Sequence, residues 1–299
     1  MEELGIKQTN NVNDIAKVLP KGNDKIPKII HYCWFGGKPL PKELTECLKT
    51  WEKLKGYTVI RWDESNCSFT ENEFIKQAHK DKQLCFICDY YRLKALYEYG
   101  GIYFDTDVKV YKSFDPLLQH KVFLNFNYDC CVGTAIIAAQ KGNPLIKSLI
   151  EMYDNTVICS EGKNGKSFYW ENGKLYTKGY HTNNYYFTYY ILKHYPKFKL
   201  NNKYQDLGDF VIYPKEKFEI GSILGKYYAI HINAGAWRKK YKGTGEETNK
   251  IKRILKKAPK LYDLIQIIVR KRRYKALNKK IPFYQYSLAQ KKGTKVPEL

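Results

Sequence analysis

The chain has 299 residues, of which 43% are hydrophobic and 15% aromatic, so it can bury a sizeable core and global disorder is excluded. The 52 Lys and Arg residues outnumber the 30 Asp and Glu residues, and the net charge of +22 indicates contact with anionic partners. Residues 251–299 carry 15 basic and 2 acidic residues and supply 13 of this net charge, so the body of the chain is only mildly basic.

The N-terminus and the cysteines give no sign of secretion. The first 20 residues lack the basic start and apolar core of a signal peptide, and no apolar run approaches the length of a membrane span. We therefore expect a cytoplasmic protein, or one that is peripheral on the inner face of the cell membrane. The eight cysteines are predicted to be reduced, and the Cys85–Cys88 spacing favours buried thiols over a zinc site because no second pair follows.

The first half of the chain alternates between predicted strands and helices. Strands are expected at 25–37, 57–65 and 102–104, and helices at 43–55, 71–80 and 83–101. The last helix is the clearest, because its apolar residues recur at helical spacing and Gly100-Gly101 end it. This alternation predicts an α/β fold with a single mostly parallel sheet flanked by helices, and ligands in such folds bind beyond the carboxyl ends of the strands.

The second half of the chain is less regular. Further strands are expected at 121–127, 133–139, 208–213 and 227–233, and a helix at 143–154. Residues 160–205 are polar and aromatic without a clear period, and they are predicted to form an excursion from the sheet. The tail at 251–280 is predicted to form a basic amphipathic helix broken at Pro259.

Two aspartates follow the predicted strand at 102–104. Because side chains alternate along a strand, Tyr103, Asp105 and Asp107 are expected to point to the same side. Two carboxylates aimed together can share a hard cation such as Mg²⁺ or Mn²⁺. A solvated turn is the alternative, but the preceding helix, double glycine and apolar strand favour a cation site.

Asp89 and Arg92 interrupt the otherwise apolar helix upstream. They are three residues apart and therefore neighbours on one helix surface. Their spacing fits two interpretations equally, a surface ion pair of little energetic value or a pair at the edge of a cleft. In a cleft, Asp89 would accept sugar hydroxyls and Arg92 would contact sugar or phosphate.

Three segments together resemble the sugar-binding D-x-D region of glycosyltransferase family 32. They are IPKIIHYCWFGG, WDES and CDYYRLKALYEYGGIYFDTDV, within residues 25–115. The same block resembles the glucosyltransferase domain of the large clostridial toxins. The resemblance implies a Rossmann-like GT-A fold, a nucleotide-sugar donor, a divalent metal (Mn²⁺ or Mg²⁺) and retention at the anomeric carbon.

Carried over residue by residue, the resemblance implies catalytic roles for Asp89, Arg92 and Asp105. Asp89 and Arg92 match the pair that holds the donor sugar, and Asp105 would contact the sugar and ribose and reach the metal through water. Asp107 would ligate the metal directly. Trp34 matches a position beside the nucleotide base, although a core tryptophan is the alternative on residue type alone.

A weaker similarity lies in YYAIHINAGAWRKK, residues 227–240. His231 is the predicted third metal ligand, because neutral imidazole suits Mn²⁺, and a buried structural histidine is the alternative. Asn233 and Trp237 are predicted to complete the donor site. Ala236 stands where the family commonly has serine, which removes a hydroxyl contact.

The domain prediction is a catalytic domain at 1–245 followed by a basic helical extension at 246–299. Within the catalytic domain, the nucleotide-sugar half spans about 25–140, the acceptor region about 141–225, and the closing motif 227–240. The extension fits a helix on an anionic membrane surface or a solvated helix packed on the core.

The resulting functional prediction is a retaining, metal-dependent glycosyltransferase of surface polysaccharide synthesis. Its donor is expected to be a UDP-hexose, with GDP-mannose as the second choice, and its acceptor a glycan or lipid-linked oligosaccharide. The sequence offers no defensible carboxylate nucleophile, so attack from the leaving group's own face is favoured over double displacement. The alternatives are a toxin-like enzyme that glycosylates a protein and a basic nucleic-acid-binding protein, for which no recognised motif exists in the sequence.

Overall fold

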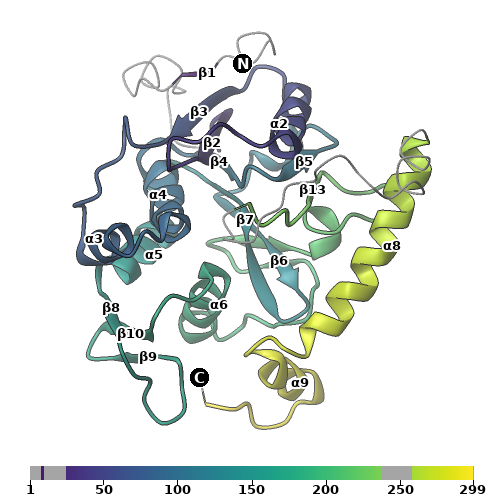
Figure 1. Cartoon of the computed structure of the whole chain (residues 1–299). Helices are drawn as coiled ribbons and strands as arrows, with labels where there is room; N and C mark the ends of the chain where they lie inside the picture. Colours follow the sequence, from purple (N-terminus) through teal and green to yellow (C-terminus); the bar gives the residue numbers. More distant parts are fainter. Residues whose placement is uncertain (1–7, 10–24, 237–257, 299) are drawn as a thin grey trace, which may run out of the picture.

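A computed structural model describes residues 8–9, 25–236 and 258–298 (Figure 1). Its centre is an eight-stranded sheet in the order β1-β3-β2-β4-β7-β6-β12-β11. In chain order the strands are β1 (Gln8–Thr9), β2 (Ile29–Cys33), β3 (Thr58–Trp62), β4 (Gly101–Phe104), β6 (Val122–Tyr128), β7 (Cys131–Ala139), β11 (Gln205–Asp206) and β12 (Val211–Tyr213). Only β7 and β11 run against the others, so the predicted α/β fold with a mostly parallel sheet is confirmed.

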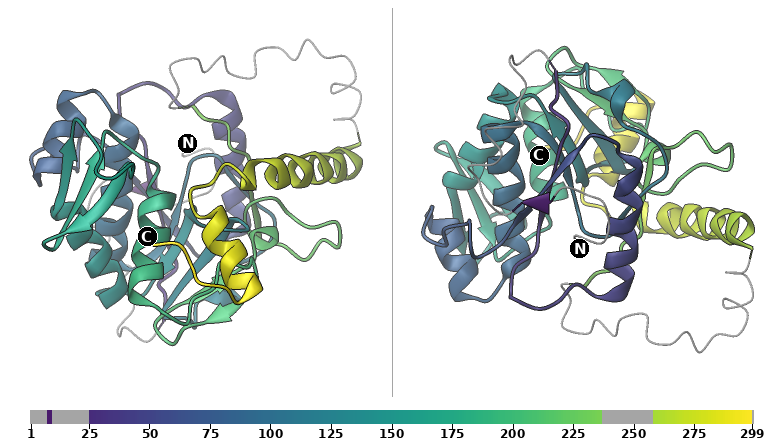
Figure 2. Two further views of the ribbon diagram at one scale, coloured as in Figure 1. Left: turned by 90° about the horizontal axis from the view of Figure 1, so that it is seen from below. Right: turned by 90° about the horizontal axis from the view of Figure 1, so that it is seen from above.

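Helices cover both faces of this sheet, and two small sheets extend it (Figures 1 and 2). The helices are α2 (Lys42–Lys49), α3 (Glu73–Lys80), α4 (Leu84–Tyr99), α5 (Pro144–Asp154), α6 (Asn183–His194), α8 (Pro259–Asn278) and α9 (Tyr284–Lys292), with short 3₁₀ turns at Thr50–Lys53, Asp115–Leu117 and Lys215–Lys217. The small sheets are β8 (Thr156–Cys159) with β10 (Lys174–Lys178) and β9 (Phe168–Glu171), and β5 (Val108–Val110) with β13 (Ala229–His231). The predicted single sheet is therefore accompanied by two smaller ones.

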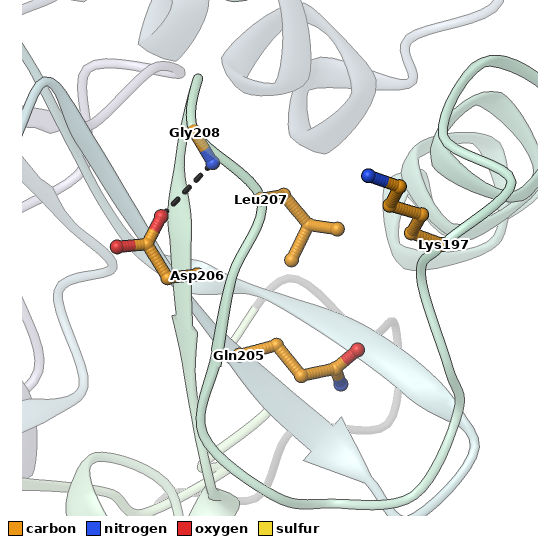
Figure 3. Close-up of a pocket in the computed structure, with 5 residues that line it drawn as sticks. All are labelled: Lys197, Gln205, Asp206, Leu207 and Gly208. Carbon is orange, nitrogen blue, oxygen red and sulfur yellow. Dashed lines mark hydrogen bonds between the residues drawn. The ribbon is translucent and has the colours of Figure 1, made fainter.

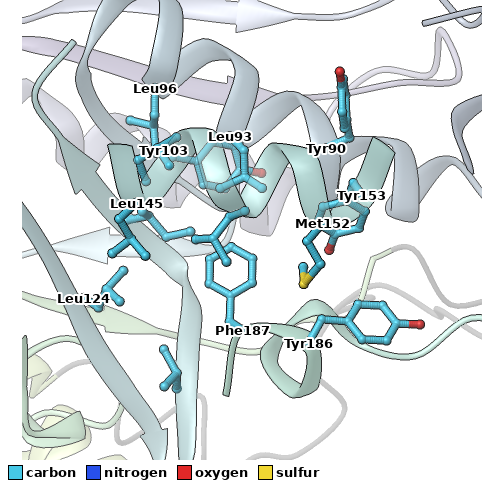
Figure 4. Close-up of a cluster of buried hydrophobic side chains, with 14 of the residues drawn as sticks. Tyr90, Leu93, Leu96, Tyr103, Leu124, Leu145, Met152, Tyr153, Tyr186 and Phe187 are labelled. Carbon is cyan, nitrogen blue, oxygen red and sulfur yellow. The ribbon is translucent and has the colours of Figure 1, made fainter. Parts of the chain in front are cut away.

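The two faces of β4 belong to two separate cores, as strand alternation requires. Tyr103 faces the core that α3, α4, α5 and α6 cover, where Leu93, Tyr153 and Phe187 also lie (Figure 4). Ile102 and Phe104 face the opposite core beside Trp51. Burying side chains of this size contributes about 2 kcal/mol each, so the strand leading to the two aspartates is held rigidly from both sides.

The double glycine between α4 and β4 permits a close approach of three backbone segments. Gly101 has a φ of 112°, and a Cβ there would lie 2.6 Å from the carbonyl oxygen of Ile29. The ring of His31 fills the remaining space, with Nε2 2.7 Å from the carbonyl oxygen of Gly100 and Nδ1 3.1 Å from Trp62 Nε1. Because Trp62 donates to Nδ1, His31 is neutral and its Nε2–H donates to Gly100. Burial accordingly lowers the pKa of His31 to about 4.

The segment 160–205 leaves the central sheet, as predicted, but it is more regular than its sequence pattern indicates. It contains strands β9 and β10 and the twelve-residue helix α6. The helical period is hidden in its sequence because α6 is buried on several sides: Tyr186, Phe187, Tyr189 and Ile191 are all buried. A helix surrounded by core does not display a single apolar stripe.

The tail is helical, as predicted, and it packs on the core. Helix α8 begins at Pro259, where proline is well tolerated, and residues 251–257 lie outside the described part of the chain. Ile267, Tyr274 and Asn278 of α8 are each 4% exposed. The predicted boundary at 245/246 falls outside the described residues and stays a prediction.

Candidate functional site

The site lies where three neighbouring parallel strands end at the same edge of the sheet. Trp34, Asp63 and Asp105 follow β2, β3 and β4 directly, and β2 pairs in parallel with both other strands. Beyond Asp105 the chain turns through Thr106 and Asp107 into β5, which pairs with β13 so that Val108 faces His231. This pairing brings the C-terminal motif to the aspartates.

Asp105, Asp107 and His231 form a cluster in which one ligand atom of each residue lies within 4.8 Å of the others. His231 Nε2 is 3.1 Å from Asp107 Oδ1, and the backbone N–H of Ala234 donates to Asp107 Oδ2 at 2.8 Å. The Asp107 and His231 side chains are each 12% exposed, and Asp105 is 29% exposed. Two carboxylates and an imidazole are a donor set that fits Mn²⁺.

Glu219 holds the other side of the His231 ring. Its Oε2 lies 3.0 Å from His231 Nδ1, and its carbonyl oxygen accepts the backbone N–H of His231 at 3.1 Å. The Glu219 side chain is only 1% exposed, and Tyr274 Oη lies 3.5 Å from it. An Nδ1–H that donates to Glu219 leaves the Nε2 lone pair directed at the cluster, the arrangement that orients metal-binding histidines.

The charges in this cluster shift one another. Burial alone would lower the pKa of His231, but the carboxylates of Asp107 and Glu219 raise it well above its usual value. Burial opposes ionisation of Asp107, yet His231 and the backbone N–H of Ala234 lower the pKa of this carboxyl group. The raised pKa of His231 therefore favours a proton on its ring, and this positive charge balances the carboxylates as a bound divalent cation would.

Arg92 organises a second cluster at the other end of the same loop. Its Nη2 is 2.7 Å from Asp89 Oδ1, and its Nη1 is 3.3 Å from Asp105 Oδ1 and 2.7 Å from the carbonyl oxygen of Thr134. Its guanidinium lies 4.5 Å from the centre of the Tyr103 ring, whose hydroxyl donates to Asp105 at 3.1 Å. Asp89 and Arg92 are thus a buried pair beside Asp105, and the surface ion-pair interpretation is wrong.

Burial and neighbouring charges shift the pKa values of this second cluster in different ways. Burial raises the pKa of Asp89 to about 7, against the opposing effect of Arg92. The pKa of Arg92 is raised well above its usual value because Tyr103, Asp105 and Asp89 outweigh its own burial. Arg92 therefore stays charged. Asp105 belongs to both clusters, because its carboxylate contacts Arg92 and also lies beside Asp107 and His231.

The remaining predicted site residues lie nearby or outside the described part. Trp34 is half-buried and its Nε1 donates to the carbonyl oxygen of Lys38 at 2.6 Å. Asn233 has a φ of 54° and its amide donates to Tyr274 Oη at 2.6 Å, so it faces α8. Trp237 lies outside the described residues. Donor contacts by Trp34 and Asn233 stay predictions.

Sequence reasoning missed four groups that support the site. They are Glu219, the backbone N–H of Ala234, and the pair Thr134–Asn183, in which the Thr134 hydroxyl donates to Asn183 Oδ1 at 2.7 Å. Asn183 is the first residue of α6, inside the segment whose sequence has no clear period. A buried Glu in the polar sequence KEKFEIG carries no local signal of its environment.

One surface cavity lies at the edge of the sheet, away from these clusters. It has a volume of about 470 Å³ and is lined by Lys197, Gln205, Asp206, Leu207 and Gly208 (Figure 3). The Asp206 carboxylate is already engaged, because Gly208 N donates to it at 2.9 Å. The cavity contains no predicted site residue.

The cysteines are free thiols, as predicted. Four of the eight are buried and four half-buried, and burial raises the pKa of Cys85 to about 12. Within the described ranges, the group of possible metal ligands is the Asp105–Asp107–His231 cluster and includes no cysteine.

Comparison with protein families agrees with this geometry. Residues 41–124 match the model of the glycosyltransferase sugar-binding region containing the DXD motif, a span that includes Asp89, Arg92, Asp105 and Asp107. This segment of the chain is therefore similar to the sugar-binding region of glycosyltransferases. Glu219 and His231 lie beyond this region and reach it through the β5–β13 pairing.

Two curated proteins of Schizosaccharomyces pombe are similar to this chain. Inositol phosphoceramide mannosyltransferase 3 is 28% identical over 130 residues, covering 42% of this chain and 36% of the relative. Inositol phosphoceramide mannosyltransferase 1 is 30% identical over 113 residues, covering 35% of each protein. The chain thus spans about a third of the length of these relatives, around the sugar-binding region.

Two solved structures align with parts of the fold. The PaToxG glycosyltransferase aligns with 47% of this chain and 63% of its own at 19% identity and a TM-score of 0.36. A glycosyltransferase involved in glycosylation of the major capsid of PBCV-1 aligns with 69% of this chain and 94% of its own at 10% identity and a TM-score of 0.35. Among the described helices, none is both long and apolar enough to cross a bilayer.

Proposed function

We propose that this protein is a retaining, metal-dependent glycosyltransferase that moves a hexose from a nucleoside-diphosphate sugar to an acceptor hydroxyl. The observation that carries the proposal is the loop Asp105-Thr106-Asp107, which joins a cluster suited to a cation to a cluster suited to a sugar. It lies in the matched sugar-binding region and at the carboxyl ends of parallel strands, where ligands of such folds bind.

The two clusters would have different roles in the reaction. Asp107 and His231 would hold Mn²⁺ or Mg²⁺, with Asp105 as the more exposed third ligand. Such a cation, when bound, neutralises charge that develops on the departing diphosphate. Glu219 acts as a positioning residue, because it keeps the Nε2 lone pair of His231 turned toward the cluster.

The sugar end is already ordered for binding. Arg92 is fixed by Asp89, Asp105 and the Thr134 carbonyl group, so its orientation costs little on binding. The carboxylates of Asp89 and Asp105 accept hydroxyl donors, which suits recognition of a hexose. Positioning and electrostatic stabilisation by these groups would supply most of the rate enhancement.

The names of the two yeast relatives favour mannose as the transferred sugar, whereas our sequence interpretation favours a UDP-hexose. The decisive experiment incubates the full chain and Mn²⁺ with UDP-glucose, UDP-galactose and GDP-mannose in turn. Release of the nucleoside diphosphate and a rise in melting temperature with one donor are expected. If no donor is hydrolysed or raises the melting temperature, the proposed function is wrong.

A panel of acceptors then separates glycan synthesis from protein modification. We expect transfer to a glycan or lipid-linked oligosaccharide in surface polysaccharide synthesis. Transfer to polypeptide alone would support the toxin-like alternative. NMR of the product anomeric proton tests retention, and an inverted product would contradict it.

A further inference from the structure

Exposed hydrophobic side chains gather on two neighbouring elements outside the metal cluster. Among the described residues, seven large hydrophobic side chains are exposed, and five of them belong to the turn Ser222–Gly225 and to helix α8. In the turn, Ile223 is 58% and Leu224 79% exposed. In α8, the exposed members are Leu261 (49%), Ile268 (37%) and Val269 (52%). We name these two elements the turn–helix surface.

The turn and the helix are in contact at their bases and project on the same side of the molecule (Figure 2). A Cβ at Gly221 would lie 3.2 Å from Ile267 Cδ1, so the start of the turn packs directly on α8. The carbonyl oxygen of Gly225 accepts a hydrogen bond from Lys112 Nζ at 2.8 Å, and Gly225 N donates to Ser222 O at 2.9 Å. The turn is therefore a defined structure that presents two apolar side chains to solvent.

Helix α8 has two apolar faces, and the core covers one of them. Ile267 and Tyr274 pack inward, each 4% exposed. Leu261, Leu264, Ile265 and Ile268 follow the spacing i, i+3, i+4 and i+7, which places them together on the outward side. Leu264 and Ile265 are half-buried and the other two are exposed.

Basic residues continue the outward face. Arg272 and Lys275 follow Ile268 at i+4 and i+7, and Lys271 lies beside them. All three are exposed, as is Lys226 after the turn, and within the described part of the chain none of the four forms an ion pair. The single acidic residue of α8, Asp263, is already engaged by Tyr111 and Lys109.

We propose that the turn–helix surface docks the protein on an anionic lipid bilayer. Ile223, Leu224 and the outward face of α8 would enter the boundary between headgroups and acyl chains, and the basic residues would contact anionic headgroups. A second copy of the chain would place the same cations opposite one another, which is unfavourable. The preceding segment 237–257 also carries 9 Lys and Arg against 2 Glu, so it shares the charge of the surface.

Nucleic acid is a poorer occupant than a bilayer. Binding of single strands uses exposed aromatic rings as stacking platforms, whereas the most exposed side chains here are aliphatic. The inward face of α8 reaches the residue that supports the metal cluster, because Tyr274 contacts Glu219 as well as Asn233. Docking would thus hold the proposed transfer site at a set height above the bilayer, where a lipid-linked acceptor resides.

The test is sedimentation of the full chain with phosphatidylcholine vesicles that contain about 30% phosphatidylglycerol, at about 0.1 M salt. The wild-type protein should bind at least about tenfold more tightly than it binds phosphatidylcholine alone. The double substitution Ile223→Ser/Leu224→Ser should weaken binding at least about tenfold. The triple substitution Lys271→Gln/Arg272→Gln/Lys275→Gln should weaken it on the order of 100-fold, about fivefold per charge.

Matched controls remove equivalent side chains that lie outside the turn–helix surface. Val296→Ser removes an exposed hydrophobic residue, and Lys80→Gln/Lys82→Gln/Lys174→Gln removes three exposed lysines. Both should leave binding within about twofold, with unchanged circular dichroism melts for all variants.

Failure of the wild-type protein to bind, or equal losses in the control triple variant, would overturn the proposal. A dimer in light scattering that the turn variant dissociates would overturn it in favour of self-association. Tighter binding to single-stranded RNA than to the vesicles would overturn it in favour of nucleic acid. The readout is binding alone, so the result is independent of the proposed glycosyl transfer.

Discussion

The two clusters on the loop Asp105–Asp107 are built in different ways. The sugar cluster joins Asp89, Arg92 and Asp105, which lie within 17 residues of one another on one helix and the strand that follows it. The metal cluster joins Asp107 to His231 and Glu219, more than 100 residues away. Local sequence therefore determines the first cluster, whereas the second depends on the fold as a whole.

The largest effect is expected from Asp107→Asn. This change removes the carboxylate that contacts both His231 and the N–H of Ala234, and it leaves Asp105 as the only charged oxygen ligand. We expect Mn²⁺ affinity, measured by electron paramagnetic resonance, to fall by more than about 100-fold and donor hydrolysis to fall with it. Asp206→Asn at the surface cavity is the control. Unchanged Mn²⁺ affinity would refute the metal cluster.

Arg92→Met tests whether the sugar cluster is also a structural unit. It leaves Asp89 buried without a partner, and breaking a buried pair in this way costs about 3–5 kcal/mol of unfolding free energy. Urea denaturation measures the loss. Lys49→Met, which removes an exposed pair with Glu46, should cost under about 0.5 kcal/mol. A similar cost for both variants would show that the buried cluster has no special importance for stability.

Glu219→Gln tests whether Glu219 positions the His231 ring for metal binding. The amide keeps the size of the side chain, and its oxygen can still accept the His231 Nδ1–H, but it lacks the negative charge that strengthens this hydrogen bond. At pH 8.5, Mn²⁺ affinity should fall by about 10- to 100-fold, and Co²⁺ absorption should report an altered ligand field. Glu216→Gln, in the 3₁₀ turn that precedes Glu219, is the control. An unchanged Co²⁺ spectrum would restrict Glu219 to a structural role.

The pH dependence of the metal-free protein provides a further test. The pKa of His231 is raised in the folded state, so its protonated form contributes stability that is fully present below the unfolded pKa of 6.5. That contribution is lost as the pH rises through the raised folded pKa. Mn²⁺ needs the neutral ring, so its affinity should increase over the same window. Thermal melts with and without Mn²⁺ from pH 6 to 9 measure both trends, and parallel trends would contradict this assignment.

Tyr274→Phe should have the smallest effect. It removes the hydroxyl of α8 that contacts Asn233 and Glu219, at a cost of about 1 kcal/mol in unfolding free energy. Mn²⁺ affinity should fall only a few fold, because His231 retains its bond to Glu219. Tyr286→Phe on α9 is the control. A larger loss than that of Glu219→Gln would mean that α8, rather than Glu219, positions the histidine.

The difference between the clusters also explains what the sequence could predict. Helix α4, strand β4 and the D-x-D loop have strong local patterns, and the structure places Asp89, Arg92 and Asp105 together as expected. His231 was found only through family resemblance. Glu219 and the support of Arg92 by Thr134 and Asn183 depend on contacts between distant segments, for which spacing along the chain provides no signal.

The double glycine has a consequence for the interpretation of natural variants and mutational scans. A Cβ at Gly100 would lie 2.7 Å from the backbone nitrogen of Lys141, and one at Gly101 would overlap the carbonyl group of Ile29. Any substitution there would push the strands apart and displace Asp105, although neither glycine belongs to either cluster. Loss of activity at these positions therefore reports a folding defect. A relative that keeps both aspartates but lacks the two glycines is therefore expected to have a different backbone path in this segment. The missing glycines alone should not lead to its being classed as an inactive enzyme.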